Sequence, residues 1–323
     1  MTVIPYSDEK AQLWDHHVAA FPMHTFLHTR RFLSYHGNRF RDQSVFLTDT
    51  GGEVVGAFPA AVDPDDQQII VSHPGITYGG LLHGERLRGE EVLLALQQIG
   101  AYYGSRGFTC LRYKAIPHMY HQVPAEDDLY ALFRLGARRY RCDLSATIDL
   151  HGSSRPSERR ARGQKKAAKH GLEIVEGAEN IERVWNVLAE NLGRKHGVRP
   201  VHSLDEICTL HALFPDNIRF IAGIHNGQVQ AGLVLFVTAT TVHAQYIASS
   251  EVGQSIAALD AVFAYAIGQA RDQGFRYFDF GISTEKGGTA LNSGLYQFKR
   301  EFGAGGTVHD FYEIALGASK NGA

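Results

Sequence analysis

The sequence predicts an α/β (α+β) protein made of two similar units, each a mixed β-sheet flanked by helices. A length of 323 residues favours two domains of roughly 150 residues each. β-rich runs and amphipathic segments alternate along the chain, which is typical of sheets with crossover helices. The same order of elements occurs twice, about 170 residues apart, which indicates an internal repeat.

Each repeat begins with a predicted β-hairpin. The first covers 44–62 around a Gly-Gly pair, and the second covers 218–237 around Asn226-Gly227. Both pairs are typical of turns with positive φ, as in type I′ hairpins. A third β-rich run follows each hairpin, at 68–82 in the first repeat and at 241–249 in the second.

An amphipathic helix comes next in each repeat. Apolar residues recur at helical spacing over 90–103 and over 255–272. Each helix is expected to end at a glycine that precedes a short strand, in SRGFTCLRY (105–113) and DQGFRYFDF (272–280). The order strand, helix, strand implies a parallel pair of strands inside a mixed sheet.

The predicted domain boundary follows residue 150, where a β-rich run gives way to Gly152, two serines and Pro156. Residues 1–150 would then form the first domain and residues 151–323 the second.

Composition excludes several classes of function. Hydrophobic residues make up 44% of the chain and the formal net charge is −2, so attraction to nucleic acid requires a local basic patch. No run approaches the ~20 apolar residues of a membrane span, and the N-terminus lacks a basic leader before an apolar run. We therefore expect a cytoplasmic protein. The three cysteines and the paired histidines have no partners at metal-ligand spacing, so no metal site is predicted.

One strongly basic segment stands out. Seven basic residues and one acid lie between Arg155 and Lys169. At ~3.6 residues per turn, four of them share one helix face: Arg159, Arg162, Lys166 and Lys169. Such a stripe suits phosphate groups, through charge and guanidinium geometry. The alternative is a solvated helix face without a ligand.

Three stretches carry a resemblance to a known family: RRARGQKKAAKHGLEIV (159–175), GFRYFDFGIS (274–283) and LNSGLYQFKREFGA (291–304). With the repeated order of elements, they resemble the Fem family of peptidoglycan-bridge aminoacyltransferases, which have two GNAT-like domains in tandem. The resemblance implies that the second domain carries the transfer site, between its fourth and fifth strands, and that the first domain meets the acceptor.

The resemblance also implies roles for individual residues. Asp279, placed by strand alternation opposite two phenylalanines, would act as a base or orient the nucleophile. Tyr246 would donate a hydrogen bond or a proton. Lys299 would assist transfer by stabilising the oxyanion or contacting the donor's phosphate or ribose.

The helix that carries Lys299 is expected to bury one stripe, consisting of Leu291, Leu295, Phe298 and Phe302. Phe298 would also shape the pocket, while Tyr296, Lys299 and Arg300 lie on the flank. In the first domain, Tyr78 and Arg30 are the expected acceptor contacts.

The donor is expected to be a co-substrate, with no cofactor bound tightly. Acetyl-CoA enzymes of this fold carry a glycine-rich loop for the pyrophosphate, whereas SSEVGQSIAALD (249–260) has one glycine and Glu251. This favours aminoacyl-tRNA, with an acyl-CoA thioester as the alternative. The acceptor would be an amine on a cell-envelope precursor or a small metabolite. A non-catalytic protein of the same fold that binds nucleic acid or a nucleotide-sugar is the alternative of another class.

Overall fold

The computed structural model describes residues 1–197 and 200–317, and the chain divides into two compact units. Unit 1 comprises residues 1–143, 286–289 and the described chain from Val308 onward. Unit 2 comprises residues 144–285 and 290–307. The units therefore meet along the chain at Asp143 and Leu144 rather than after residue 150, and the C-terminal segment returns to unit 1.

Unit 2 is built on one mixed sheet with the strand order β8-β13-β12-β11-β10-β9. β12 and β13 are parallel and the other neighbours are antiparallel. Its strands are β8 (Arg138–Asp149, which begins in unit 1), β9 (Glu173–Glu176), β10 (Ile218–His225), β11 (Gln228–Val237), β12 (Thr241–Ser249), β13 (Tyr277–Ile282) and the small hairpin β14 (Thr284–Glu285) and β15 (Ala290–Leu291). Its helices are α5 (Glu158–Lys169), α6 (Ile181–His196), α7 (Leu204–Leu213), α8 (Glu251–Ser255), α9 (Ala258–Asp272) and α10 (Ser293–Arg300). The predicted α/β class is confirmed.

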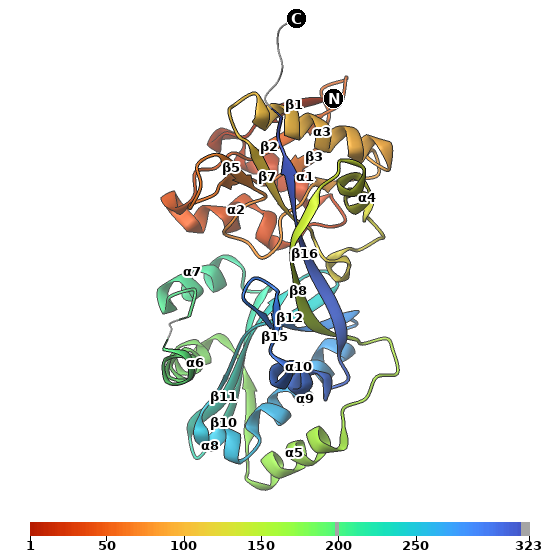
Figure 1. Ribbon diagram of the computed structural model, residues 1–323. Helices are drawn as coiled ribbons and strands as arrows, with labels where there is room; N and C mark the ends of the chain where they lie inside the picture. The colour runs from red at the N-terminus through yellow and green to blue at the C-terminus, as the bar shows by residue number, and fades with distance from the viewer. Residues whose placement is uncertain (198–199, 318–323) are drawn as a thin grey trace, which may run out of the picture. The chain divides into compact units, whose positions relative to one another are not determined.

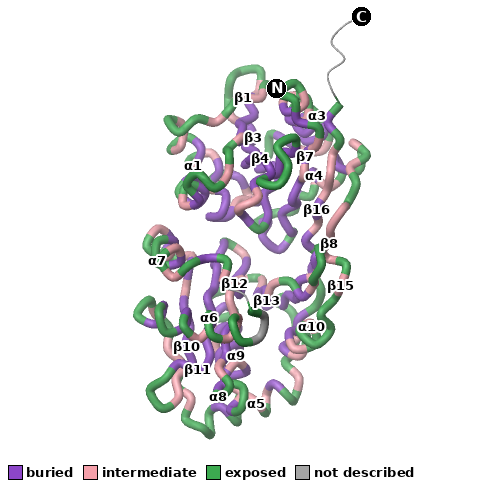
Figure 2. Tube along the Cα trace, turned by 60° about the vertical axis from the view of Figure 1, so that its left-hand side comes forward, coloured by how far each residue is buried: buried purple, intermediate pink, exposed green. Residues whose placement is uncertain are grey.

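Helices α6 and α9 cover opposite faces of this sheet, as Figure 1 shows. A Cβ added at Gly223 of β10 would lie 2.9 Å from Val262 of α9. A Cβ added at Gly232 of β11 would lie 2.7 Å from Val184 of α6. Both helices therefore approach the sheet at positions where the absence of a side chain leaves room. The basic helix α5 is largely exposed on its outer side (Figure 2).

The turn of the β10–β11 hairpin has the predicted conformation. Asn226 and Gly227 have φ angles of 51° and 73°, as a type I′ turn requires. In the first repeat the prediction is only partly confirmed, because Gly52 has a positive φ of 86°. There the pairing register shifts between Leu47 and Thr48, so the hairpin contains a bulge beside a longer turn.

Unit 1 repeats the order hairpin, strand, helix, strand. β2 (Val45–Thr48) and β3 (Val54–Phe58) form the hairpin, β5 (Ile69–Val71) follows, and α3 (Glu90–Gly104) connects to β7 (Cys110–Lys114), which is parallel to β5. The other elements are β1 (Thr2–Pro5), β4 (Ala61–Val62), β6 (Leu82–His83), β16 (Gly305–Ala315, which begins in unit 2), α1 (Ala11–Ala19), α2 (Arg30–Leu33) and α4 (Asp127–Arg134).

Each unit takes one strand of its sheet from the other half of the sequence: β8 in unit 2 and β16 in unit 1. In unit 2, β13 pairs with β8 through residues 145–149. In unit 1, β7 pairs with β16 through residues 311–315, near the C-terminus. This exchange explains why a boundary placed by linker composition at residue 150 differs from the compact units. Within residues 1–197 and 200–317, every helix is too short or too polar to cross a bilayer.

Candidate active site

The parallel strands β12 and β13 of unit 2 separate after a short paired stretch. They pair at three positions, of which His243 opposite Asp279 is the last. Beyond that point β12 continues along β11 to Ser249, while β13 continues along β8 to Ile282. We call this point of separation the fork. The divergence expected between the fourth and fifth strands of the unit is therefore present.

A bulge on each strand accompanies the fork. On β12, Val234 pairs with Tyr246 but Leu235 pairs with Ala244, so Gln245 is the extra residue. On β13, the register shifts between Asp279 and Ile282 relative to β8. Gly281 within this shift has a φ of 76°, a conformation that other residues adopt at a cost. Such bulges bend a strand and redirect its side chains, and they are common beside active sites.

Asp279 lies at the fork and is fully buried. Its carboxylate accepts hydrogen bonds from Thr147 Oγ1 at 2.9 Å, from Ser145 Oγ and from the backbone N–H of Gly281 at 3.2 Å. It also contacts Nδ1 of His243 at 2.6 Å. The structure therefore places Asp279 as the partner of a histidine rather than at an exposed strand end.

His243 is the site residue that sequence reasoning missed. Its side chain is 14% exposed, whereas that of Asp279 is 0% exposed. A Cβ added at Gly281 would lie 3.4 Å from Cε1 of the imidazole, so the bulge of β13 adjoins the ring. Local sequence patterns do not single out His243. Its role becomes visible only from the register of β12 and β13, which pairs residues 243 and 279.

Lys299 is buried rather than placed on the helix flank as predicted, with 2% of its surface exposed. Its Nζ donates hydrogen bonds to the carbonyl oxygens of Gly281 at 2.8 Å and Ile282 at 2.7 Å. Burial lowers the pKa of Lys299 to about 8, although the charge of Asp279 opposes this shift. The side chain thus connects α10 to the bulge of β13.

The remaining residues of this segment differ from the predicted stripe. Leu291 lies outside α10 and is 47% exposed, and Leu295 is 38% exposed. The stripe fails because α10 is short and presents its lysine, not these leucines, to the sheet. Phe298 is half-buried, and Phe302 packs on Phe280 and Phe263 as expected for a core residue. Tyr296 is half-buried and Arg300 is exposed.

Tyr246 stands on β12 beside α6. Its hydroxyl contacts Nδ1 of His202, and its ring packs edge-on against Trp185 at a centroid distance of 5.1 Å. Burial raises the pKa of Tyr246 to about 12. The phenol therefore stays protonated at neutral pH, which is compatible with the predicted role as a hydrogen-bond donor.

A cavity of about 420 Å³ lies where α5 crosses the connection between β12 and α9. We call it the α5–α9 cavity. Three of the four stripe residues line it, whereas Lys169 is not part of its lining. The lining consists of Arg159, Arg162, Gly163 and Lys166 with Arg160 from α5, Ser249, Gly253, Gln254, Ala257, Leu259 and Asp260 from the connection and α9, and Phe298 from α10.

Arg160 fixes α5 in this position. It is 8% exposed and forms ion pairs with Asp260 of α9 at 2.5 Å and Glu301 at 2.6 Å. Its guanidinium also lies 4.5 Å from the ring centre of Phe298. One member of the basic segment is therefore structural, and it orients the exposed members toward the cavity.

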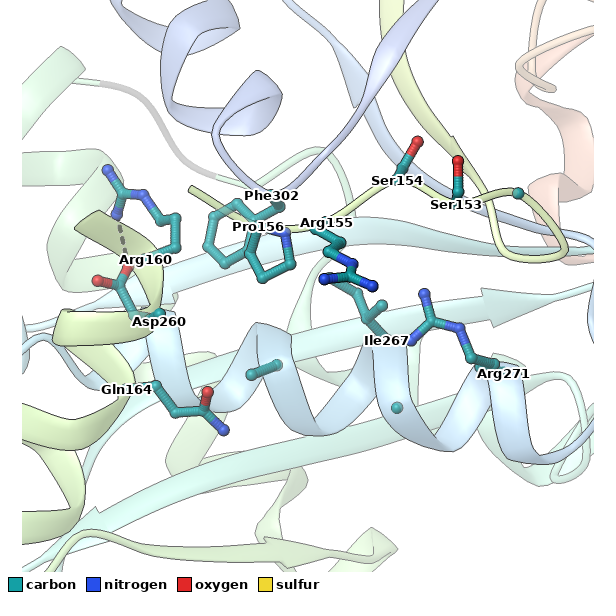
Figure 3. A pocket seen from close by; sticks show the side chains of 14 residues that line it. Ser153, Ser154, Arg155, Pro156, Arg160, Gln164, Asp260, Ile267, Arg271 and Phe302 are labelled. Carbon is teal, nitrogen blue, oxygen red and sulfur yellow. Dashed lines mark hydrogen bonds and ion pairs between the residues drawn. The ribbon is translucent and has the colours of Figure 1, made fainter. Parts of the chain in front are cut away.

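A second cavity, of about 500 Å³, shares Arg160 and Asp260 with the first (Figure 3). Its lining includes Ile267 and Phe302 as an apolar part and Arg155 and Arg271 as charged groups.

Glu251, expected to repel a pyrophosphate, contacts Arg194 and is not part of the α5–α9 lining. Backbone N–H groups of the connection are already used within the chain: Gly253 donates to Ser250 Oγ, and Gln254 and Ala257 donate to carbonyl oxygens. The connection therefore differs from a glycine loop whose free N–H groups hold phosphate.

The predicted acceptor contacts lie in unit 1. Tyr78 is 3% exposed and packs on Tyr120 at a centroid distance of 4.3 Å, so it is a core residue in this structure. Arg30 is also buried, paired with Asp42 and placed over the rings of Tyr6 and Trp14. It lines a cavity of about 710 Å³.

The corresponding strands of unit 1 do not form an open fork. Beyond the β5–β7 pairing, Ser72 Oγ accepts a hydrogen bond from the N–H of Lys114, whose carbonyl accepts one from Gly79. A Cβ at Gly79 would lie 1.9 Å from the Ser72 carbonyl oxygen, so this backbone fills the gap. Among the described residues, no group of three or more His, Cys, Asp or Glu side chains is placed to hold a metal ion.

Two units, each with a parallel pair of strands joined by a helix, and the fork in unit 2 define a tandem GNAT fold. Residues 155–300 match the sequence profile described as "Acetyltransferase (GNAT) domain". The matched residues lie mainly in unit 2, and the two units together have a tandem GNAT fold.

Solved structures share this fold at low sequence identity. FemX has a TM-score of 0.67 and 12% identity, covering 98% of both chains. L-PGS from Bacillus licheniformis has a TM-score of 0.60 and 14% identity, covering 95% of this chain and 91% of the other. A tandem GNAT protein from the clavulanic acid biosynthesis pathway has a TM-score of 0.53 and 12% identity, covering 98% and 99%. No curated protein matches the sequence significantly.

Proposed function

We propose that this protein is an N-acyltransferase. It would bind a phosphate-bearing acyl donor in the α5–α9 cavity and transfer the acyl group to an amine at the fork of unit 2. One observation carries the proposal: three residues of the basic stripe, the connection between β12 and α9, and Phe298 line a single cavity. The GNAT profile over residues 155–300 covers all of these elements.

The electrostatics of the cavity favour an anionic ligand. Arg159, Arg162 and Lys166 bring three cationic side chains, of which Arg159 also pairs with Glu301 and Arg162 with Glu158. The cavity adjoins the N-terminal end of the 15-residue helix α9. Asp260, the one acid in the lining, is paired with Arg160. A phosphate group entering the cavity would therefore meet net positive charge.

We favour aminoacyl-tRNA as the donor. Since several N–H groups of the connection are engaged, phosphate contacts would come mainly from the side chains of α5. Exposed side chains of this kind suit the charges of an extended polyanion. An acyl-CoA thioester is the second candidate, because the N-terminus of α9 could still hold a pyrophosphate.

Lys299 and Tyr246 would support the transfer without moving. The Lys299 ammonium holds the bulge of β13, and its charge favours an oxyanion formed near the strand end. Tyr246 offers a hydroxyl on the other strand of the fork. The acceptor would be a primary amine on a cell-envelope precursor or a small metabolite.

The proposal is tested by incubating the protein with aminoacyl-tRNAs or acyl-CoAs and a panel of primary amines, with mass spectrometry of the amide products. We expect product with one donor class and a thermal shift from that donor alone. Binding of a donor or a nucleotide-sugar without any product would favour the non-catalytic alternative.

Charge variants of α5 show whether the cavity is the donor site. Arg162→Gln combined with Lys166→Gln removes two lining charges, and we expect the donor KM to rise roughly 10- to 100-fold. Lys165→Gln combined with Lys169→Gln removes the same charge from the same helix outside the lining. Equal effects of the two pairs would refute the cavity as the donor site.

A further inference from the structure

We propose that His243 is the catalytic base of the transfer and that Asp279 is its positioning residue. This inference rests on the proposed function, because it assigns the proton acceptor of that same reaction. The ring nitrogen Nε2 of His243 would take the proton of the attacking amine.

The location of His243 is the first argument. Residues 243 and 279 form the last pair before β12 and β13 separate. A group at this position stands at the inner end of the fork, between the two strands that would flank the acyl carbonyl. The imidazole keeps 14% of its surface exposed even though its partner is completely buried.

The orientation of the ring is the second argument. A carboxylate can only accept hydrogen bonds, so the 2.6 Å contact with Asp279 requires the proton of His243 on Nδ1. Nε2 is then left with its lone pair, which is the form that a general base needs. Ser145 and Thr147 donate to the other carboxylate oxygen, Oδ1, and prevent the carboxylate from rotating.

The bulge of β13 provides the third argument. The N–H of Gly281 donates to Asp279, and the carbonyl of Gly281 accepts from Lys299. This residue is therefore fixed on both sides, and a Cβ there would lie 3.4 Å from Cε1 of the imidazole, so Gly281 adjoins the ring. Lys299 thus keeps the glycine in place beside the histidine.

The neighbouring titratable groups are less suited to accept a proton. The Nζ of Lys299 already donates to two carbonyls, and burial of Tyr246 raises its pKa to about 12. Asp279 has no exposed surface. Asp279 on β13 contacts His243 directly, and Lys299 on α10 lies within the electrostatic influence of Asp279.

The proposed step conserves atoms and charge. The neutral amine attacks the acyl carbonyl and forms the C–N bond, while Nε2 takes one proton from the nitrogen. The bond from the acyl carbon to the donor's ester oxygen or thioester sulfur then breaks. The Nε2–H proton passes to that leaving oxygen or sulfur, which restores neutral His243 and yields an amide.

The test compares His243→Asn with the wild-type protein. Asparagine keeps a side-chain N–H for Asp279 but has no group in place of Nε2, so folding should survive. We expect kcat to fall about 10²- to 10⁴-fold, with the donor KM unchanged and the acidic limb of the pH–rate profile lost. For His243→Ala, we expect added imidazole to restore part of the rate.

The control is His225→Asn, which changes a histidine at the end of β10 away from the fork and should leave kcat unchanged. An active wild-type protein with a His243→Asn variant that keeps its kcat and its pH profile would overturn this inference alone. A wild-type protein that transfers no acyl group from either donor class would overturn the proposed function and this inference together.

Discussion

Gly163 provides the sharpest test of how α5 is held over its cavity. In a helix interior, Gly→Ala usually stabilises a protein by about 0.5–1 kcal/mol. Here a Cβ would lie 1.7 Å from Oδ2 and 3.0 Å from Cβ of Asp260. Since real Cβ atoms do not approach so closely, α5 or Asp260 must move. We therefore expect the opposite sign for Gly163→Ala.

The magnitude follows from the group that is displaced. Asp260 is 7% exposed and forms the buried ion pair with Arg160. Disrupting one partner of a buried pair costs about 3–5 kcal/mol. After subtracting the helix-propensity gain, we expect Gly163→Ala to lower the free energy of unfolding of unit 2 by about 2–4 kcal/mol. The α5–α9 cavity should lose its shape, and donor affinity should fall.

Gly268→Ala in α9 is the matched control. It is also a helical glycine, but a Cβ there would have no atom within 4 Å beyond its own helix. Differential scanning calorimetry should show a lower melting temperature for Gly163→Ala and an equal or higher one for Gly268→Ala. If both variants were stabilised, the close approach of α5 and α9 would be refuted.

Three further outcomes can be measured. First, burial lowers the pKa of Lys299 to about 8, so the free energy of unfolding of the wild-type protein should rise by about 3 kcal/mol from pH 8 to pH 10.5 and be lost again as pH falls through that range. Lys299→Met should remove this rise, which urea titrations across the range measure. Second, Asp128→Asn should raise the melting temperature at pH 7.5 but not at pH 4, because burial raises the pKa of Asp128 to about 6 and ionisation costs stability above it; equal shifts at both pH values would contradict this. Third, Tyr246→Phe should cost about 1 kcal/mol through the lost contact with His202, measurable by chemical denaturation.

Local patterns were sufficient to predict much of the fold. The hairpin at Asn226-Gly227, the helices α3, α5 and α9, and the strands after α3 and α9 were predictable, because turn chemistry and hydrophobic period act within a few residues. The exchange of β8 and β16 was not predictable. It depends on which strand completes each sheet, and residues far apart in the sequence decide that.

The candidate site was also predictable only in part, because local patterns identify single residues but not the pairing of distant strands. Sequence reasoning selected Asp279 and Lys299, and the structure brings both to the bulge of β13. It missed His243, because the pairing of residues 243 and 279 depends on the register of two strands separated by a helix. The burial of Lys299 was also missed, since the carbonyl groups that accept its hydrogen bonds face it only once the bulge has formed.

Comparison of the two units supports placing the chemistry in unit 2. Both units pair a β-strand in parallel with the strand that follows its helix, at β5–β7 and at β12–β13. In unit 1 the space beyond the pair is filled by the backbone of Gly79, and the last paired residues are Val71 and Arg112. In unit 2 the last pair is a histidine and a buried carboxylate. The same backbone arrangement therefore serves packing in one unit, whereas in the other it brings His243 into contact with Asp279.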